Sequence, residues 1–249
     1  MSRWKAAGIH LSISIAIGLI VGALLFGVWY PPPFFHAAGA DQLVLLLVSV
    51  DIVLGPLLTL VVFKSGKRGL KFDLALIGFM QSVALVYGLS IVLRSRPVFL
   101  VAAVDRFALV SAADIGDVDL AQGRKPEFRT RSWTGPVTVG AQLPPPGKAR
   151  TEILFSSLKG KDVETMPKFY VDYSDISSEF LTRAKPVSAL AVRDPDAQRR
   201  LDSATRESGL SPAQLLWVPI VALKANMVML LDAQNGKPIR AVAVNPWPN

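Results

Sequence analysis

The sequence predicts an α+β protein in which a three-helix membrane domain, residues 1–93, precedes an α+β domain with an antiparallel sheet, residues 94–249. Three apolar runs lie in the first part of the chain, and each is roughly 20 residues long, enough for a helix to cross about 30 Å of hydrocarbon. A short loop with four cations and no acid joins the second and third runs. After residue 93 the pattern changes to short apolar runs bounded by turn residues, which is typical of strands and short helices.

The three apolar runs predict helices at about residues 7–30, 43–63 and 72–93. Arg3 and Lys5 precede the first run, so this run could also be a signal peptide. It is too long for that, and it ends in aromatic residues and a row of prolines rather than at a small-residue cleavage site. Aromatic rings at the interface and prolines that end the helix both favour a retained membrane helix.

The distribution of Lys and Arg predicts the orientation of these helices. The loop at residues 31–42 contains no cation, whereas the next loop contains Lys64, Lys67, Arg68 and Lys71. Because cations are retained on the cytoplasmic side, we expect a cytoplasmic N-terminus and a periplasmic C-terminal domain. Arg94 and Arg96 favour the opposite orientation, but snorkelling at the interface accounts for them.

Asp51 is the sharpest candidate for a functional residue, because a carboxylate within a membrane helix is costly unless it is paired, protonated or hydrated. The second and third helices form a hairpin, and their lengths from the loop place Asp51 and Gln81 at similar depths, so we expect the two to face each other. Pro56 also frees a main-chain carbonyl one turn earlier. The predicted intramembrane polar face consists of Asp51, Gly55, Pro56, Thr59, Asp73 and Gln81.

Three interpretations of Asp51 remain open. A protonated Asp51 could hydrogen-bond Gln81 and hold the hairpin together, or Asp51 could engage a polar group on a partner's membrane helix. Proton or ion transport is a third interpretation, for which three helices without inverted repeats make a poor path. Gly18 and Gly22 form a GxxxG pair that could bring another helix close, although such pairs also occur by chance.

The outward domain carries clear turn and cap signals. Asn235-Gly236 predicts a hairpin between the last two strands, and Asp194-Pro195 predicts the start of a helix that continues to about Glu207. A second helix is expected at residues 174–185, and Trp247 is expected to pack back on the sheet. We expect strands at residues 98–104, 107–112, 151–157, 218–224, 227–232 and 239–244, with a short one within 135–140.

Catalytic and metal-binding patterns are not found in the sequence. The chain contains no cysteine, and its two histidines, His10 and His36, lie near the predicted membrane boundaries. There is no G-x-S-x-G elbow, P-loop or G-x-G-x-x-G loop. The net charge of +8 is scattered rather than gathered in a stripe with aromatic platforms, which argues against nucleic-acid binding. We therefore expect a protein that is not an enzyme and needs no cofactor.

Several stretches taken together resemble the type IV pilin accessory proteins of the TfpX/TfpZ type. They are SVDIVLGPLLTLVVF, RPVFLVAAVDRFALVSAADI, MPKFYVDY and WVPIVALKANMVMLLDAQNGKPIRAVAVNPW. The matching positions are Asp51, Gly55 and Pro56 in the membrane and Asp105, Arg106, Phe107, Pro167, Tyr170, Pro219, Asp232 and Gly236 in the outward domain. The resemblance implies no catalytic residues.

The resemblance also implies a function. It indicates a multi-pass protein of the bacterial inner membrane that associates with a major type IV pilin and supports pilin stability or pilus assembly, in the manner of a chaperone. Other pilus assembly components and the lipid bilayer are further expected partners. Two alternatives stay open: a membrane-anchored sensor or regulatory subunit of an envelope complex, and a partner of a pilin-modifying enzyme.

Overall fold

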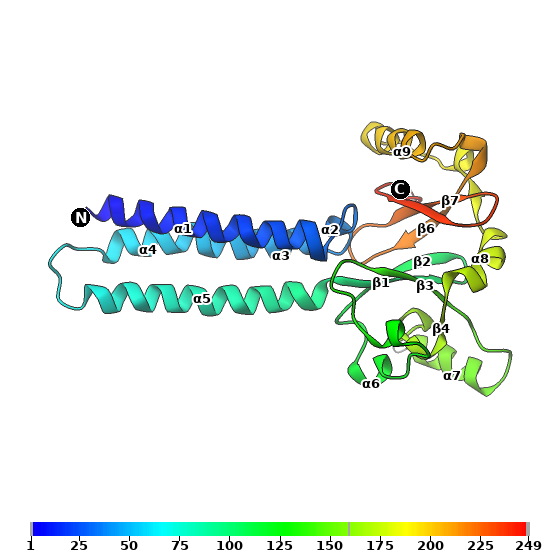
Figure 1. The fold of residues 1–249 in the computed structure, drawn as a ribbon, viewed down its shortest axis with the longest axis horizontal. Coiled ribbons are helices and arrows are strands. Elements are labelled where there is room, and N and C mark those ends of the chain that lie inside the picture. Colours follow the sequence, from blue (N-terminus) through cyan, green and yellow to red (C-terminus); the bar gives the residue numbers. More distant parts are fainter. Residues whose placement is uncertain (1, 159, 248–249) are drawn as a thin grey trace.

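The computed structural model describes residues 2–158 and 160–247 and shows a rod of helices followed by an α+β head (Figure 1). The described residues include three helical segments long and apolar enough to cross a membrane, at Arg3–Trp29, Ala40–Val62 and Leu70–Ser95. The predicted α+β class, with apolar helices first, is confirmed. The elements of the rod are α1 (Arg3–Leu24), η1 (Leu25–Trp29), α2 (Phe34–Ala37), α3 (Ala40–Ser49), η2 (Val50–Leu54), α4 (Gly55–Val62) and α5 (Leu70–Ser95).

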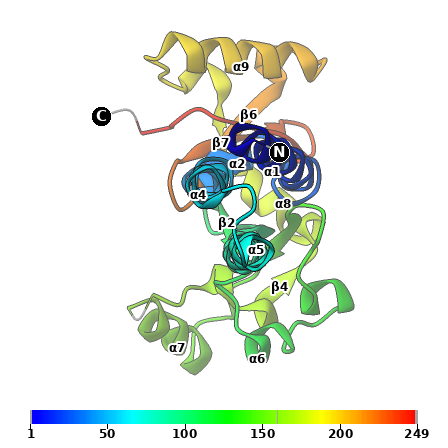
Figure 2. The same ribbon diagram turned by 90° about the vertical axis from the view of Figure 1, so that its left-hand side faces the viewer.

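The second span packs against both of the other two (Figure 2). Its α4 lies against α1, and both α3 and α4 lie against α5. Most large side chains of the three spans point outward, as expected of helices whose solvent is lipid. Two short π-helical turns interrupt the spans: η1 ends the first, and η2 lies in the middle of the second. Such turns change which residues face a neighbouring helix.

The head is built on one mixed sheet in the strand order β4-β3-β1-β2-β6-β7-β8, with β5 also paired to β6. Most neighbouring strands are antiparallel as expected, but β1 with β3 and β2 with β6 are parallel. The reason is that β3 and β6 are added to the two outer sides of the hairpin formed by β1 and β2, where each runs in the same direction as the hairpin strand beside it. The strands are β1 (Pro97–Ala103), β2 (Arg106–Ser111), β3 (Val137–Ala141), β4 (Tyr170–Val171), β5 (Lys185–Pro186), β6 (Leu215–Val221), β7 (Met227–Asp232) and β8 (Pro238–Val242).

Helices cover both faces of the sheet. The cluster around β1 and β3 is closed by α6, α7 and the turns after them, and the opposite face is covered by α8 together with α2 of the rod. The face of β6, β7 and β8 packs against α9. These elements are α6 (Asp117–Leu120), η3 (Pro126–Arg129), α7 (Lys148–Ser157), η4 (Val163–Thr165), η5 (Pro167–Phe169), α8 (Tyr173–Leu181), η6 (Val187–Ala189), α9 (Pro195–Glu207) and η7 (Pro212–Gln214).

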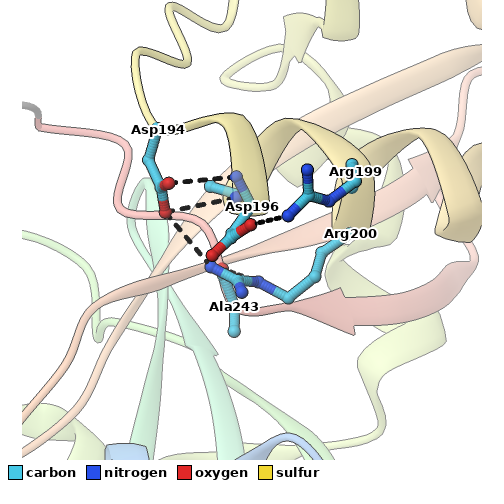
Figure 3. Close-up of polar contacts among 6 residues, drawn as sticks. Asp194, Asp196, Arg199, Arg200 and Ala243 are labelled. Atoms are coloured by element: carbon cyan, nitrogen blue, oxygen red, sulfur yellow. Dashed lines mark hydrogen bonds and ion pairs between the residues drawn. The ribbon is translucent and has the colours of Figure 1, made fainter.

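The start of α9 follows its sequence signal. The Asp194 carboxylate accepts hydrogen bonds from the main-chain N–H groups of Asp196 and Ala197, at 3.0 and 3.2 Å, and Pro195 takes the first helical position (Figure 3). Arg200 then donates to the carbonyl of Ala243 at 3.0 Å, which ties α9 to the chain that follows β8. The cap and the arginine together fix this helix over the sheet.

Two expectations for the head are wrong. Residues 151–157 form part of α7 rather than a strand, because the good helix formers around them outweigh the β-prone Ile153 and Phe155. Trp247 remains 49% exposed instead of packing on the sheet, since β8 ends at Val242 and the chain then leaves the sheet.

The third span continues into the central strand through a single residue, Arg96. Its guanidinium donates to the carbonyls of Ser132 at 3.1 Å and Leu93 at 2.7 Å, and it lies 4.6 Å from the ring centroid of Trp133. The side chain is buried, not snorkelling as expected, whereas Arg94 is exposed. Burial and the nearby Arg131 lower the pKa of Arg96. This junction leaves no free linker between the rod and the head.

The first span is fixed at the same level. The Tyr30 hydroxyl donates to the carbonyl of Val92 at 2.7 Å, and burial raises the pKa of Tyr30, so it remains a neutral donor. The main-chain N–H of Lys224, from the head, donates to the carbonyl of Ala37 at 2.9 Å. The contacts of Arg96, Tyr30 and Lys224 therefore join the third span, the end of the first span and α2 to one another and to the head.

We predict that Arg96→Lys destabilises the protein by about 2 kcal/mol, because an ammonium cannot reproduce two diverging hydrogen bonds and a stacked plane. The measurement is thermal unfolding of the full chain in detergent. Arg94→Lys is the matched control, two residues away and exposed, and should change nothing. Equal stability of the two variants would contradict the role given to Arg96.

A half-buried carboxyl group in the head, that of Glu164, is expected to make the stability of the protein depend on pH. One oxygen of Glu164, Oε2, is buried without a hydrogen-bond partner among the described residues, and burial raises the pKa of this group, as does Asp162 to a lesser degree. A raised folded-state pKa means that the contribution to stability is complete below the unfolded value and is lost as pH rises through the folded value.

We therefore predict that Glu164→Gln is as stable as the native chain at pH 4 and more stable at pH 7. The measurement is the difference between the two unfolding midpoints as a function of pH. Glu152→Gln, on the exposed side of α7, is the control and should leave the pH profile unchanged. Parallel profiles for native protein and Glu164→Gln would rule out a pH-dependent contribution from this side chain.

Candidate functional site within the membrane helices

The structure brings Asp51, Gly55 and Gln81 together in the hairpin of the second and third spans. The side-chain amide of Gln81 donates to the main-chain carbonyl of Asp51 at 3.4 Å. It lies directly over the Cα of Gly55, where an added Cβ would sit 2.1 Å from Gln81 Nε2. The absence of a side chain at residue 55 is therefore what lets Gln81 reach across.

Pro56 explains why this carbonyl needs a donor. In the π-helical register of η2 the N–H of residue 56 would bond to the carbonyl of residue 51, but proline has no N–H. The interior of a membrane offers no water to take its place. Gln81 supplies the missing donor, so the Asp51, Gly55, Pro56 and Gln81 positions form one unit.

The carboxyl group of Asp51 has further polar neighbours. It lies beside the Gln81 amide and within electrostatic range of the His10 ring in α1. The remaining oxygen of Gln81, Oε1, is buried without a hydrogen-bond partner in the described part of the chain. The cluster thus has one acceptor to which nothing in the described chain donates.

Thr59 connects the first span to the cluster. Its Oγ1 lies 2.6 Å from His10 Nδ1, and the Thr59 side chain is buried between α1 and α4. The sequence did not predict this contact, and His10 was expected near a membrane boundary. The available signal was the spacing of His10, Ser14 and Gly18, which puts them on one face of α1, with Ser14 also buried.

The other predicted membrane residues lie apart from this cluster. Asp73 pairs with Lys67 at 2.6 Å beside the loop. Gly18 faces Ile52, whose Cδ1 would be 3.8 Å from an added Cβ, whereas Gly22 has no heavy atom of the described chain within 4 Å of that position. Gly22 therefore makes no close helix contact within the described chain.

The family-matched positions of the head build the fold rather than a pocket. Phe107 and Tyr170 are fully buried, and Asp105 pairs with Arg106 at 2.9 Å in the turn between β1 and β2. Pro167 begins η5, and Pro219 lies in β6 opposite Val228.

The turn between β7 and β8 holds the last two matched positions. The Asp232 carboxylate accepts from the N–H of Gln234 at 2.8 Å. Gly236 has φ +72° and its carbonyl accepts from the Tyr173 hydroxyl at 2.7 Å. An added Cβ at Gly236 would lie 2.9 Å from the carbonyl oxygen of Ser177, so this tight turn is docked onto α8. Burial raises the pKa of Tyr173 to about 12, which keeps the hydroxyl a donor.

The described residues hold no group of three or more His, Cys, Asp or Glu side chains placed to bind a metal ion. The membrane cluster offers hydrogen-bond donors and acceptors in an apolar setting. Its chemistry suits helix–helix recognition, because polar groups in lipid are stabilised by pairing with other polar groups.

The known proteins that the chain resembles are fimbrial assembly proteins. The sequence model of the family described as fimbrial assembly protein FimB matches residues 1–39. The chain is 28% identical to the fimbrial assembly protein of Dichelobacter nodosus serogroup I over 98% of its own length and 95% of that protein. The serogroup E1 protein matches to the same extent. The protein of serogroups C1 and C2 is 36% identical over 45% of this chain and 86% of its own length. No solved structure matches.

We predict that Gly55→Ala destabilises the helical hairpin by about 1 kcal/mol, since the new methyl group displaces the Gln81 amide and the Asp51 carbonyl loses its donor. Gln81→Ala should cost a similar amount. Because both changes remove the same bond, the double variant should be no worse than either single one. Unfolding of the full chain by SDS in mixed micelles measures all three.

Gly78→Ala is the matched control for this cycle. It lies on α5 with no heavy atom of the described chain within 4 Å of the added Cβ, so it should leave stability unchanged or slightly higher. Additive effects of Gly55→Ala and Gln81→Ala would show that the two residues act separately.

Proposed function

The chain belongs to the fimbrial assembly protein FimB family, and from this premise we propose that it acts in pilus assembly as a non-enzymatic accessory protein of the membrane. In this proposal it binds the major type IV pilin while the pilin waits in the membrane, and it keeps the subunit stable until it is incorporated. The similarity to the Dichelobacter nodosus proteins over nearly the whole chain supports the coarser statement, a role in pilus assembly.

The observation that carries the proposal is the polar cluster in the spans. The carboxyl group of Asp51 lies beside the Gln81 amide and within electrostatic range of the His10 ring, and Asp51 is only half-buried, so a second helix can reach it. Because an unsatisfied polar group is costly in lipid, a partner helix that brings a donor gains both affinity and register. A pilin with an apolar N-terminal helix is a partner of this kind.

The placement of the chain in the membrane belongs to the same proposal. We place the N-terminus and the basic loop in the cytoplasm of a bacterial cell and the head in the periplasm, with the helices in the inner membrane. The charge difference between the two loops supports this orientation. The head would then stand on the side where a pilin displays its own globular part.

A cavity in the head favours a second candidate function, that of a sensor or regulatory subunit. It has a volume of about 390 Å³ and opens between α2 and α9, with His36, Arg200 and Asn245 in its lining. Retention of a small molecule through purification of the native protein, with release on unfolding, would favour this alternative over pilin binding.

Coexpression of the cognate pilin with this protein tests the proposed function. The native chain should raise the amount of pilin, copurify with it in detergent and increase surface pili. Asp51→Leu should lose these effects, because it removes the polar group, whereas Asp51→Asn should keep them, because an amide still forms hydrogen bonds. Pilin level by immunoblot and pili by electron microscopy are the readouts.

Val53→Leu provides the matched control, since residue 53 lies in the same π-helical turn but is exposed and apolar. It should behave as the native chain. Unchanged pilin level, copurification and piliation with Asp51→Leu would remove Asp51 from the mechanism. A missing mass on pilin from cells that lack the protein would instead favour the modification alternative.

A further inference from the structure

The strand directions place several loops of the head at the level where the spans end. Since β1 leaves Arg96 directly, its first residue marks the membrane side of the sheet (Figure 1). The antiparallel β2 ends on this side, and β3, which is parallel to β1, begins there. β6 runs parallel to β2, so the loop at residues 222–226 also lies on this side.

Trp133 lies beside the last turn of the third span. Its ring covers the guanidinium of Arg96, which itself reaches back to the carbonyl of Leu93 in that turn. Despite this contact the indole remains 60% exposed. A tryptophan next to the end of a membrane helix is at the depth where amphipathic rings are most stable.

Leu223 lies at the same level in a different loop. It lines a cavity of about 200 Å³ together with Ser95, the last residue of α5, and Pro97, the first of β1. Its side chain is 80% exposed, and the next residue, Lys224, is bonded through its main chain to Ala37. A leucine this exposed to water gives up the favourable free energy of burying its apolar surface, whereas at a lipid surface that area would be buried.

The opposite end of the sheet has a different character. The turn between β7 and β8 there consists of residues 233–237, and its exposed members are polar. The turn between β1 and β2 exposes Val104 to 55% between the charged Asp105 and the end of β1. Val104 therefore serves as an exposed apolar reference far from the spans.

Charged groups flank the two apolar side chains on the membrane side. Arg94 and Lys224 are exposed. The acids near this level already have partners: Asp41 pairs with His36 at 2.9 Å, and Asp114 accepts from the N–H and hydroxyl of Ser111 at 2.7 and 2.8 Å. Exposed cations beside apolar side chains match the phosphate layer of a bilayer.

We propose that this membrane-side face, defined by Arg94, Trp133, Leu223 and Lys224, rests on the surface of the bilayer from which the helices emerge. Trp133 and Leu223 enter the interfacial region, and the two cations lie at the level of the lipid phosphates. The face is continuous with the three spans, so a lipid surface is the partner it meets without any further motion. The proposal depends on the spans crossing a membrane and not on the role in pilus assembly.

Lipid quenching of single labels tests the proposal. The chain has no cysteine, so Thr134→Cys, Leu223→Cys and Val104→Cys each give one attachment site for the fluorophore NBD. The full chain is reconstituted into vesicles of phosphatidylcholine and phosphatidylglycerol that contain a lipid with a doxyl quencher close to the headgroup. We expect quenching at residues 134 and 223 to be about threefold greater than at residue 104.

The three sites control for one another. All are exposed, so label access to water is similar in the absence of lipid contact, and an unchanged unfolding midpoint shows that each labelled protein is folded. Residue 134 leaves Trp133 in place, and the two membrane-side sites belong to separate loops. Quenching at either site no greater than at residue 104 would overturn the proposal.

Discussion

The structure depends on one buried cation at the point where a membrane helix becomes a strand. Arg96 lies between α5 and β1, bonds the carbonyls of Leu93 and Ser132, and stacks on Trp133. No acidic side chain of the described residues pairs with it, and its charge is stabilised by carbonyl dipoles and an aromatic face. Because β1 is buried along its whole length, Arg96 sets the position of the sheet relative to the third span, and the Tyr30 and Lys224 contacts support it.

In the polar cluster of the spans, too, a buried polar group is stabilised by neighbouring residues that compensate for one another. Pro56 removes a donor, Gln81 restores it, and Gly55 makes the space for Gln81. The π-helical turn η2 is where the register changes. The Asp51 carboxyl group stays half-buried beside the Gln81 amide, and it is the group on which we base recognition of a partner.

Local signals predicted elements well, whereas contacts between distant segments escaped them. Asp194-Pro195 and Asn235-Gly236 each act within a few residues, and both produced the expected helix start and turn. The place of β3 and β6 on either side of the first hairpin is set by core packing, which no local pattern encodes. His10 and Thr59 are 49 positions apart in the sequence, so their contact depends on how the helices pack and could not be predicted from local patterns.

Because α5 continues directly into β1, the orientation of the head depends on the thickness of the bilayer. Between Asp73 and Arg94 the apolar part of α5 is about 30 Å long and matches a hydrocarbon core of about 30 Å, so in a thinner bilayer the helix would tilt to keep this length buried. With no hinge at Arg96, the sheet inherits this tilt. A thinner membrane would increase the tilt of the head relative to the membrane normal, and a thicker one would decrease it. Lipid composition would therefore set the orientation of the domain.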